Sequence, residues 1–169
     1  MDNPQLTHAD HQAEKRCFPL RILLDDISDP ANVGAIFRMA DALGVARLLL
    51  CGRTVPPPNR RLGRTSRATD KVVAYECHDN SAVAATALCK QGYRLVALEL
   101  TQQSVELKTV DYAAMEKICL IIGAEQAGVS PALLEIVDQT VHIPMLGQDS
   151  SMNVAMACAI AAHEITRQL

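Results

Sequence analysis

Short, nearly continuous apolar segments alternate along this chain with segments in which apolar residues recur at helical spacing. The apolar segments predict buried strands over 20–25, 45–51, 72–75, 93–100, 117–122 and 140–143. The helical spacing predicts helices over 31–43, 81–90, 131–137 and 151–168, with Gly92 just beyond the end of the second helix. Alternating strands and helices are typical of an α/β domain, and we therefore predict a parallel sheet flanked by helices.

The first 19 residues differ from the rest because they are polar and show no periodicity. We predict a flexible arm over 1–19 and one domain over 20–169, since 169 residues with 49% hydrophobic side chains suffice for a single buried core. No apolar run is long enough to cross a bilayer, and no signal peptide is recognisable at the start. We expect a cytoplasmic protein without a membrane partner.

The cysteines are scattered, without a Cys-x-x-Cys pair or a histidine at zinc-ligand spacing. We interpret them as small core residues and predict no metal site. The six are Cys17, Cys51, Cys77, Cys89, Cys119 and Cys158.

The distribution of charge matters more than its total. A net charge of -3 argues mildly against a nucleic-acid partner. However, the loop that follows the three prolines of 56–58 belongs to a segment, 53–71, that holds six basic residues against the single acid Asp70. This arginine stripe is either a solvated loop or a surface for RNA phosphates. It consists of Arg53, Arg60, Arg61, Arg64, Arg67 and Lys71.

The loop and helix after the first predicted strand carry unusual polar residues. Gly34 lies inside the predicted helix, where glycine costs about 1 kcal/mol relative to alanine, so we expect something to approach its backbone closely. Asn32 and Arg38 accompany it, and Arg38 is four residues on, on the same face. The alternative is an ordinary surface helix whose Arg38 pairs with Asp41 or Asp25.

Two further loops follow predicted strands, where ligands of open α/β sheets bind. After residue 122, Gly123 and Gly128 bracket Glu125, although neither a Gly-x-Gly-x-x-Gly pattern nor a P-loop is present. After residue 143, a polar loop leads into a helix of small apolar residues. There we expect Ser150 or Ser151 as the N-cap and Asn153 in the first turn with its side chain free.

Taken together, these three segments resemble the three signature motifs of the SpoU/TrmH branch of the SPOUT superfamily of RNA methyltransferases. The resemblance spans roughly residues 20–168 and holds in order and in spacing. Met152 stands where the family usually has leucine, a volume-conserving change. The motifs are Asn32-x-Gly34-x-x-x-Arg38, Ile122-Gly123-x-Glu125-x-x-Gly128 and Ile143-Pro144-Met145-x-Gly147-x-x-x-Ser151-Met152-Asn153-Val154.

The resemblance implies a deep C-terminal trefoil knot and a pocket for S-adenosylmethionine among three loops. Backbone groups would hold the adenine, and apolar side chains such as Ile122 and Met145 suit such a slot. The cofactor-binding residues implied are Leu98, Glu99, Leu100, Ile122, Gly123, Glu125, Gly128, Ile143, Pro144, Met145, Ser151, Met152 and Asn153.

The resemblance also implies methylation of a ribose 2′-hydroxyl, with Arg38, Asn32 and Glu125 as the catalytic residues. A guanidinium stays charged up to about pH 12, so we interpret Arg38 as an anchor for phosphate and for the developing alkoxide. Glu125 or solvent would then accept the proton. A deprotonating arginine, as envisaged for the family, is the alternative.

The implied partners are RNA and a second copy of the chain. We expect no separate N-terminal RNA-binding domain of the kind that some relatives carry, and therefore expect the domain itself to bind RNA, with tRNA favoured over rRNA. We expect a homodimer through the first and last helices, in which Arg38 completes the partner's site and Ala155, Ala159 and Ala162 contribute apolar surface beside Met156 and Ile160. The competing functions are methylation of a base nitrogen and RNA binding without catalysis.

Overall fold

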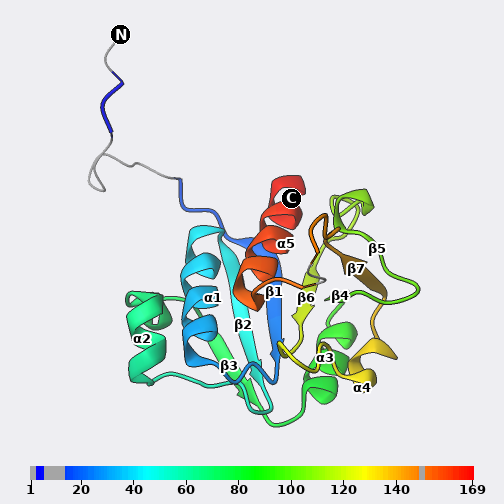
Figure 1. The fold of residues 1–169 in the computed structure, drawn as a ribbon, viewed down its shortest axis with the longest axis horizontal. Helices are drawn as coiled ribbons and strands as arrows, with labels where there is room; N and C mark the ends of the chain where they lie inside the picture. Colours follow the sequence, from blue (N-terminus) through cyan, green and yellow to red (C-terminus); the bar gives the residue numbers. More distant parts are fainter. Residues whose placement is uncertain (1–2, 6–13, 149–150) are drawn as a thin grey trace.

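The computed structural model describes residues 3–5, 14–148 and 151–169, which form one parallel sheet with helices on both faces (Figure 1). The seven strands have the order β3-β2-β1-β6-β4-β7-β5, and every neighbouring pair is parallel. The strands are β1 (Phe18–Asp25), β2 (Val45–Cys51), β3 (Tyr75–His78), β4 (Arg94–Leu98), β5 (Val105–Glu106), β6 (Ile118–Ile122) and β7 (Gln139–His142). The helices are α1 (Pro30–Ala42), α2 (Arg60–Ser66), α3 (Ser81–Lys90), α4 (Pro131–Leu134) and α5 (Val154–Gln168), with 3-10 turns at Thr69–Lys71 and Leu107–Thr109.

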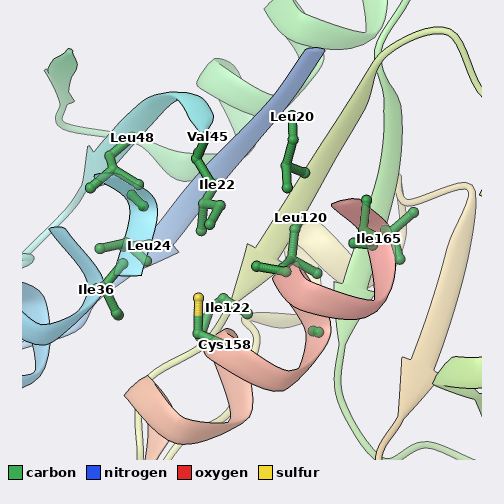
Figure 2. Packing of buried hydrophobic residues seen from close by; sticks show 14 of the residues in the cluster. Leu20, Ile22, Leu24, Ile36, Val45, Leu48, Leu120, Ile122, Cys158 and Ile165 are labelled. Atoms are coloured by element: carbon green, nitrogen blue, oxygen red, sulfur yellow. The ribbon is translucent and has the colours of Figure 1, made fainter. Parts of the chain in front are cut away.

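The central strands are apolar throughout because both faces of the sheet are covered. Leu20, Ile22 and Leu24 of β1 pack under α1 and α5, where Ile36 and Cys158 meet them (Figure 2). Leu23, between them in sequence, points to the opposite face and packs with residues of α3 and α4. Side chains alternate between faces along a strand, so a continuous apolar run is needed to fill both cores.

The predicted α/β class is confirmed, and β2 and α3 have the predicted bounds. The strand predicted over 72–75 is wrong: Val72 is 71% exposed after a 3-10 turn, and β3 begins only at Tyr75. The β-branched pair at 72–73 resembles a strand locally, but the sheet pairs Tyr75 with Leu48 and leaves Val72 outside. Other elements shift or shorten at their ends, where local signals are weakest.

Two segments hold structure that the sequence did not predict. The arginine stripe is not a loop throughout, because it includes α2 and the 3-10 turn at Thr69–Lys71. The polar stretch after β4 contains β5, a two-residue edge strand paired with β7. Both elements are too short for hydrophobic periodicity to register.

The N-terminal boundary falls at Phe18, whose amide donates to the Gly44 carbonyl at 2.8 Å, so the sheet takes in two residues of the predicted arm. Residues 1–2 and 6–13 of that arm lie outside the described residues. Cys51 and Cys158 are buried in the core as predicted, and burial raises the pKa of each thiol to about 12. Cys119 is also buried, whereas Cys17, Cys77 and Cys89 are exposed, which contradicts the prediction for those three.

All strands of a parallel sheet end at the same edge, and that edge positions the candidate site. The loops after β1, β4, β6 and β7 meet there with the N-terminal ends of α1 and α5 (Figure 1). Within the described residues, no helix has the length and apolar character needed to span a membrane.

Candidate functional site

A cavity of about 920 Å³ lies at the carboxyl edge of β4, β6 and β7. This volume lies in the range of small-molecule and cofactor pockets. The loops after β4, β6 and β7 form its walls, and twelve of the thirteen predicted cofactor-binding residues line it. These are Leu98, Glu99, Leu100, Ile122, Gly123, Glu125, Gly128, Ile143, Pro144, Met145, Ser151 and Met152.

Asn153 is the thirteenth, and it does not line the cavity. It is the N-cap of α5: its side-chain oxygen accepts from the amides of Ala155 and Met156 at 3.0 and 3.2 Å. The expected cap at Ser151 and the expected free Asn153 side chain are therefore wrong, and Ser150 lies outside the described residues. Serine and asparagine are both good caps, so local preference alone could not choose between them.

A chain of side-chain hydrogen bonds joins the three motifs. Asn153 Nδ2 donates to Asn32 Oδ1 at 3.0 Å, and Asn32 Nδ2 donates to Glu125 Oε1 at 2.6 Å. Because the Asn153 oxygen is committed to the α5 amides, only its NH₂ group is left to face Asn32. The same constraint then turns the Asn32 NH₂ group toward Glu125, so each amide has one orientation. The Glu125 carboxylate is thereby held as an acceptor at the cavity wall.

Glu99 lines the cavity and also joins two of its loops. Its two carboxylate oxygens accept from the amides of Leu100 and Val129, at 3.0 and 2.9 Å. The side chain thus fastens the loop after β4 to the loop after β6. Gly128, beside it, adopts a φ of 68°, and a Cβ there would overlap the Glu99 carboxylate.

Gly123 allows the loop after β6 to fold back on itself. Ala124 and Gly128 exchange two backbone hydrogen bonds across the turn, at 3.1 and 2.8 Å. A Cβ on Gly123 would overlap the backbone of Gly128 and Val129. The glycine is therefore required by this turn, which presents Glu125 at its tip.

The sequence reasoning missed about half of the cavity wall. Most of these residues lie directly beside a motif position in the same loop after a strand. Their place next to a motif in the sequence, and not their residue type, could have identified them as lining residues. His142, for example, ends β7 just before Ile143 and contacts Ser104 Oγ through Nδ1 at 2.9 Å. The missed residues are Thr101, Ala124, Gln126, Ala127, Val129, Pro131, Leu134, His142, Gly147, Gln148, Val154 and Ala157.

The structure does not bring Arg38 to the cavity of its own chain. Arg38 is exposed on α1, and it forms no ion pair within residues 14–148 and 151–169. The alternative pairing with Asp41 or Asp25 is thus not observed; Asp25 instead accepts from the Ser130 amide at 3.0 Å. A guanidinium without an acidic partner is available for an external anion.

The close approach expected at Gly34 is confirmed, but the approaching group is part of the protein. A Cβ on Gly34 would overlap the Leu62 carbonyl and the Thr65 side chain of α2. Gly34 therefore allows α1 and α2 to pack closely and does not face a ligand. The inner face of α2 is accordingly apolar or small, with Leu62 fully buried.

The arginine stripe divides into paired and unpaired members. Arg61 Nη2 lies 3.4 Å from Asp29, the N-cap of α1, and Arg53 Nη2 lies 3.4 Å from Asp26. Such exposed pairs contribute little to stability, but they partly neutralise these two charges. The remaining four are exposed and form no ion pair with another described residue: Arg60, Arg64, Arg67 and Lys71.

The outward face of α5 is apolar. Met156 is 65% and Ile160 44% exposed, and a second cavity of about 450 Å³ lies beside Ile160 and Ala159. Ala162 does not belong to this surface, because it is fully buried in the core beneath the helix. The expectation that Ala162 contributes to an exposed apolar face is therefore wrong. Met156 and Ile160 lie on the side of α5 that faces solvent, whereas Ala162 lies on the side that faces the core.

The chemistry available at the site combines an apolar slot with fixed hydrogen-bonding groups. The backbone amides of Met145, Leu146 and Gly147 donate no hydrogen bond to another described residue, and can therefore serve a bound molecule. Two carboxylates are held at the wall: Glu125 by the Asn32 amide, and Glu99 by the backbone amides of Leu100 and Val129. No group of three or more metal-ligating side chains occurs among the described residues.

Comparison with known proteins identifies a family model, described as the SpoU rRNA Methylase family, that matches residues 19–163. The tRNA (guanosine(18)-2′-O)-methyltransferase of Escherichia coli K12 is 31% identical over 151 residues, covering 88% of this chain. The chain spans only 63% of that relative's length. The enzyme of the same name from Aquifex aeolicus is 34% identical over 155 residues, covering 92% of this chain and 72% of the relative.

Solved structures give the same picture. An AdoMet-bound rRNA methyltransferase from Sinorhizobium meliloti superposes with a TM-score of 0.84 at 29% identity, covering 93% of this chain and 59% of that one. A TrmH/SpoU tRNA modifying enzyme from A. aeolicus superposes with a TM-score of 0.79 at 31% identity, covering 92% and 77%.

Proposed function

Because the chain belongs to the SpoU rRNA Methylase family, we propose that it methylates a ribose 2′-hydroxyl of RNA with S-adenosylmethionine as donor. The observation that carries this proposal is the hydrogen-bonded chain of Asn153, Asn32 and Glu125 at the cavity wall. Three segments far apart in sequence supply these residues, and each is a motif of the family. The curated relatives are named as tRNA 2′-O-methyltransferases, and we propose tRNA as the substrate.

The cavity fits S-adenosylmethionine in size and in chemistry. Its volume of about 920 Å³ accommodates a nucleoside with an amino-acid side chain. Ile122, Ile143 and Met145 would flank the adenine, and the amides after Pro144 would read its edge. Neutral groups suffice for this binding, so we propose that no metal takes part.

When bound, the cofactor would supply the methyl group of a sulfonium to the ribose oxygen, and the demethylated thioether would be the leaving group. The hydroxyl must lose its proton in the same event. We assign the proton to Glu125, whose carboxylate reaches the cavity and is held as an acceptor by Asn32. Asn32 is then a positioning residue, and its own orientation depends on Asn153.

Arg38 serves the RNA side of the reaction in this proposal. A permanently charged guanidinium binds phosphate and stabilises negative charge on the attacking oxygen. Since Arg38 is exposed and does not line the cavity of its own chain, we propose that it reaches the cavity of a second copy. The apolar outward face of α5 at Met156 and Ile160 supports such a homodimer, because monomers rarely leave a contiguous apolar face uncovered.

We propose that the C-terminal part of the chain forms a trefoil knot, in which the segment from Ile143 into α5 passes through the loops after β4 and β6. In support, β7 lies beyond β4 at one side of the sheet, whereas α5 returns to pack on α1. The cavity lined by all three loops is the expected consequence of such a passage.

The direct test is incubation with labelled S-adenosylmethionine and unmodified tRNA in the presence of a metal chelator. We expect label in a ribose, located by nuclease mapping; label in a base, or none, would overturn the proposal. The shared site is tested by mixing Arg38→Ala and Glu125→Gln chains, because Glu125 lines the cavity of its own chain and Arg38 does not. Heterodimers then contain one intact site, so activity should return, whereas mixtures stay inactive if each chain is self-sufficient.

A further inference from the structure

The two glycines of the α1–α2 pair have opposite surroundings. Gly34 is required by packing, because α2 occupies the place of its side chain. Gly63, in the middle of α2, has no atom of the described residues within 4 Å of the position its Cβ would take, and its φ is not positive. Glycine inside a helix is costly, and neither packing nor backbone conformation within the described chain accounts for this one.

The unpaired arginines surround Gly63. At about 100° per residue, Arg60, Gly63 and Arg64 lie on one side of α2, opposite Leu62, and Arg67 follows them as the C-cap in the left-handed conformation. This placement agrees with their burial, since Leu62 is inaccessible and the other four residues are exposed. Arg61 projects sideways to Asp29. The outward face of α2 thus exposes its backbone at Gly63, next to three unpaired arginine side chains.

One end of this face lies beside the N-terminal end of α1. Arg61 in the first turn of α2 contacts Asp29, which caps α1 three residues before Asn32. A polymer bound along α2 would therefore pass the N-terminal end of α1, where the hydrogen-bonded chain to Glu125 begins. The acid nearest in sequence, Asp70, is bonded to Ser66 and does not pair with these arginines.

We propose that the outward face of α2 is the contact surface for the sugar–phosphate backbone of one RNA strand, with Gly63 at the point of closest approach. This inference rests on the proposed function and refines it. Arg60, Arg64 and Arg67 bind successive phosphates, and the missing side chain at 63 lets the strand approach the helix. Arg53 and Arg61, engaged with acids, contribute less.

Gly63→Ala distinguishes this proposal from a structural role of Gly63. A structural role predicts a lower melting temperature for the variant, whereas the proposal predicts a higher melting temperature together with weaker tRNA binding. Alanine favours the helix, so the melting temperature should rise. Binding of fluorescently labelled unmodified tRNA should nevertheless weaken by a factor on the order of ten, the cost of one methyl group forced into a close contact. Thr86→Ala, at an exposed position of α3, is the matched control and should leave tRNA affinity unchanged.

The arginines are tested by the salt dependence of the same tRNA binding. Replacing Arg60, Arg64 and Arg67 with glutamine should lower the slope of log affinity against log salt by about two to three, at 0.7 to 0.9 per phosphate contact. Arg53→Gln with Arg61→Gln should lower it by less than one. Arg94→Gln, an exposed arginine paired with Asp138, controls for the loss of charge and should not change the slope.

The proposal for the α2 surface would be wrong if Gly63→Ala bound tRNA with wild-type affinity. It would also be wrong if replacing the three arginines left the salt dependence of tRNA binding unchanged. Wild-type methylation measured alongside separates the two proposals. If the wild type methylates tRNA while these variants bind normally, only the surface is wrong. If the wild type transfers no methyl group, the proposed function itself fails.

Discussion

The cavity and the outward face of α2 use polar residues in opposite ways. At the cavity, Asn153, Asn32, Glu125 and Glu99 are held by hydrogen bonds within the protein, so their positions are set before any ligand arrives. On α2, the arginines at 60, 64 and 67 extend into solvent without an acidic partner in the described chain. The first arrangement suits a small ligand recognised by shape, and the second suits a polyanion recognised by charge.

Removal of Arg38, which is exposed on α1, should have the largest effect. Arg38→Ala should reduce turnover by roughly 10² to 10³, the usual loss when a group that stabilises developing charge is deleted. Cofactor affinity should stay within a few fold by calorimetry, because Arg38 does not line the cavity. Turnover close to that of the wild type would remove Arg38 from the reaction.

Gly123→Ala should alter the cavity and leave the outward face of α2 unchanged. The added methyl overlaps the turn that presents Glu125, so cofactor affinity should fall by up to about a hundredfold. Labelled tRNA should still bind to the variant. Gly63→Ala makes the same chemical change on α2 and should give the reverse result, with normal cofactor binding and weaker tRNA binding. Equal effects of both variants on both ligands would show that the regions are not separate.

Salt separates the two regions without mutation. Raising salt from about 50 to about 200 mM should weaken tRNA binding by a factor on the order of tens if three or so phosphates are contacted. Cofactor binding depends on neutral groups and an apolar slot, so its affinity should hardly change. Fluorescence anisotropy for tRNA and calorimetry for the cofactor measure the two responses in the same buffers. A cofactor affinity as salt-dependent as that of tRNA would contradict the comparison.

The smallest effect should come from the far end of the hydrogen-bonded chain. Asn153→Ala removes the cap of α5, at a cost of about 1 kcal/mol in the free energy of unfolding, and lowers turnover. Asn153→Asp keeps a capping oxygen but cannot donate to Asn32. Its melting temperature should therefore stay near the wild-type value while turnover falls. If turnover follows stability alone in the two variants, the chain of hydrogen bonds does not position Glu125.

Local patterns were sufficient for the fold class and for the place of the site. The apolar runs of β1, β2 and β6 predicted a sheet covered on both faces, because a strand buried on one face would alternate. The motif loops were placed after strands, and parallel strands must end at a common edge. Twelve of the thirteen cofactor-binding residues that the family resemblance implied line one cavity at that edge.

Pairing between distant side chains was decided only by the tertiary structure. Asn153 and Asn32 are 121 residues apart, and nothing near either of them in the sequence specifies that their amides face each other. The same is true of Gly34, whose close neighbour is α2, and of Arg38, which does not line the cavity of its own chain. Periodicity and caps describe interactions within a few residues. Which faces and loops come together depends on how the complete core packs, and so the sequence determined the parts of this site while the packing determined their partners.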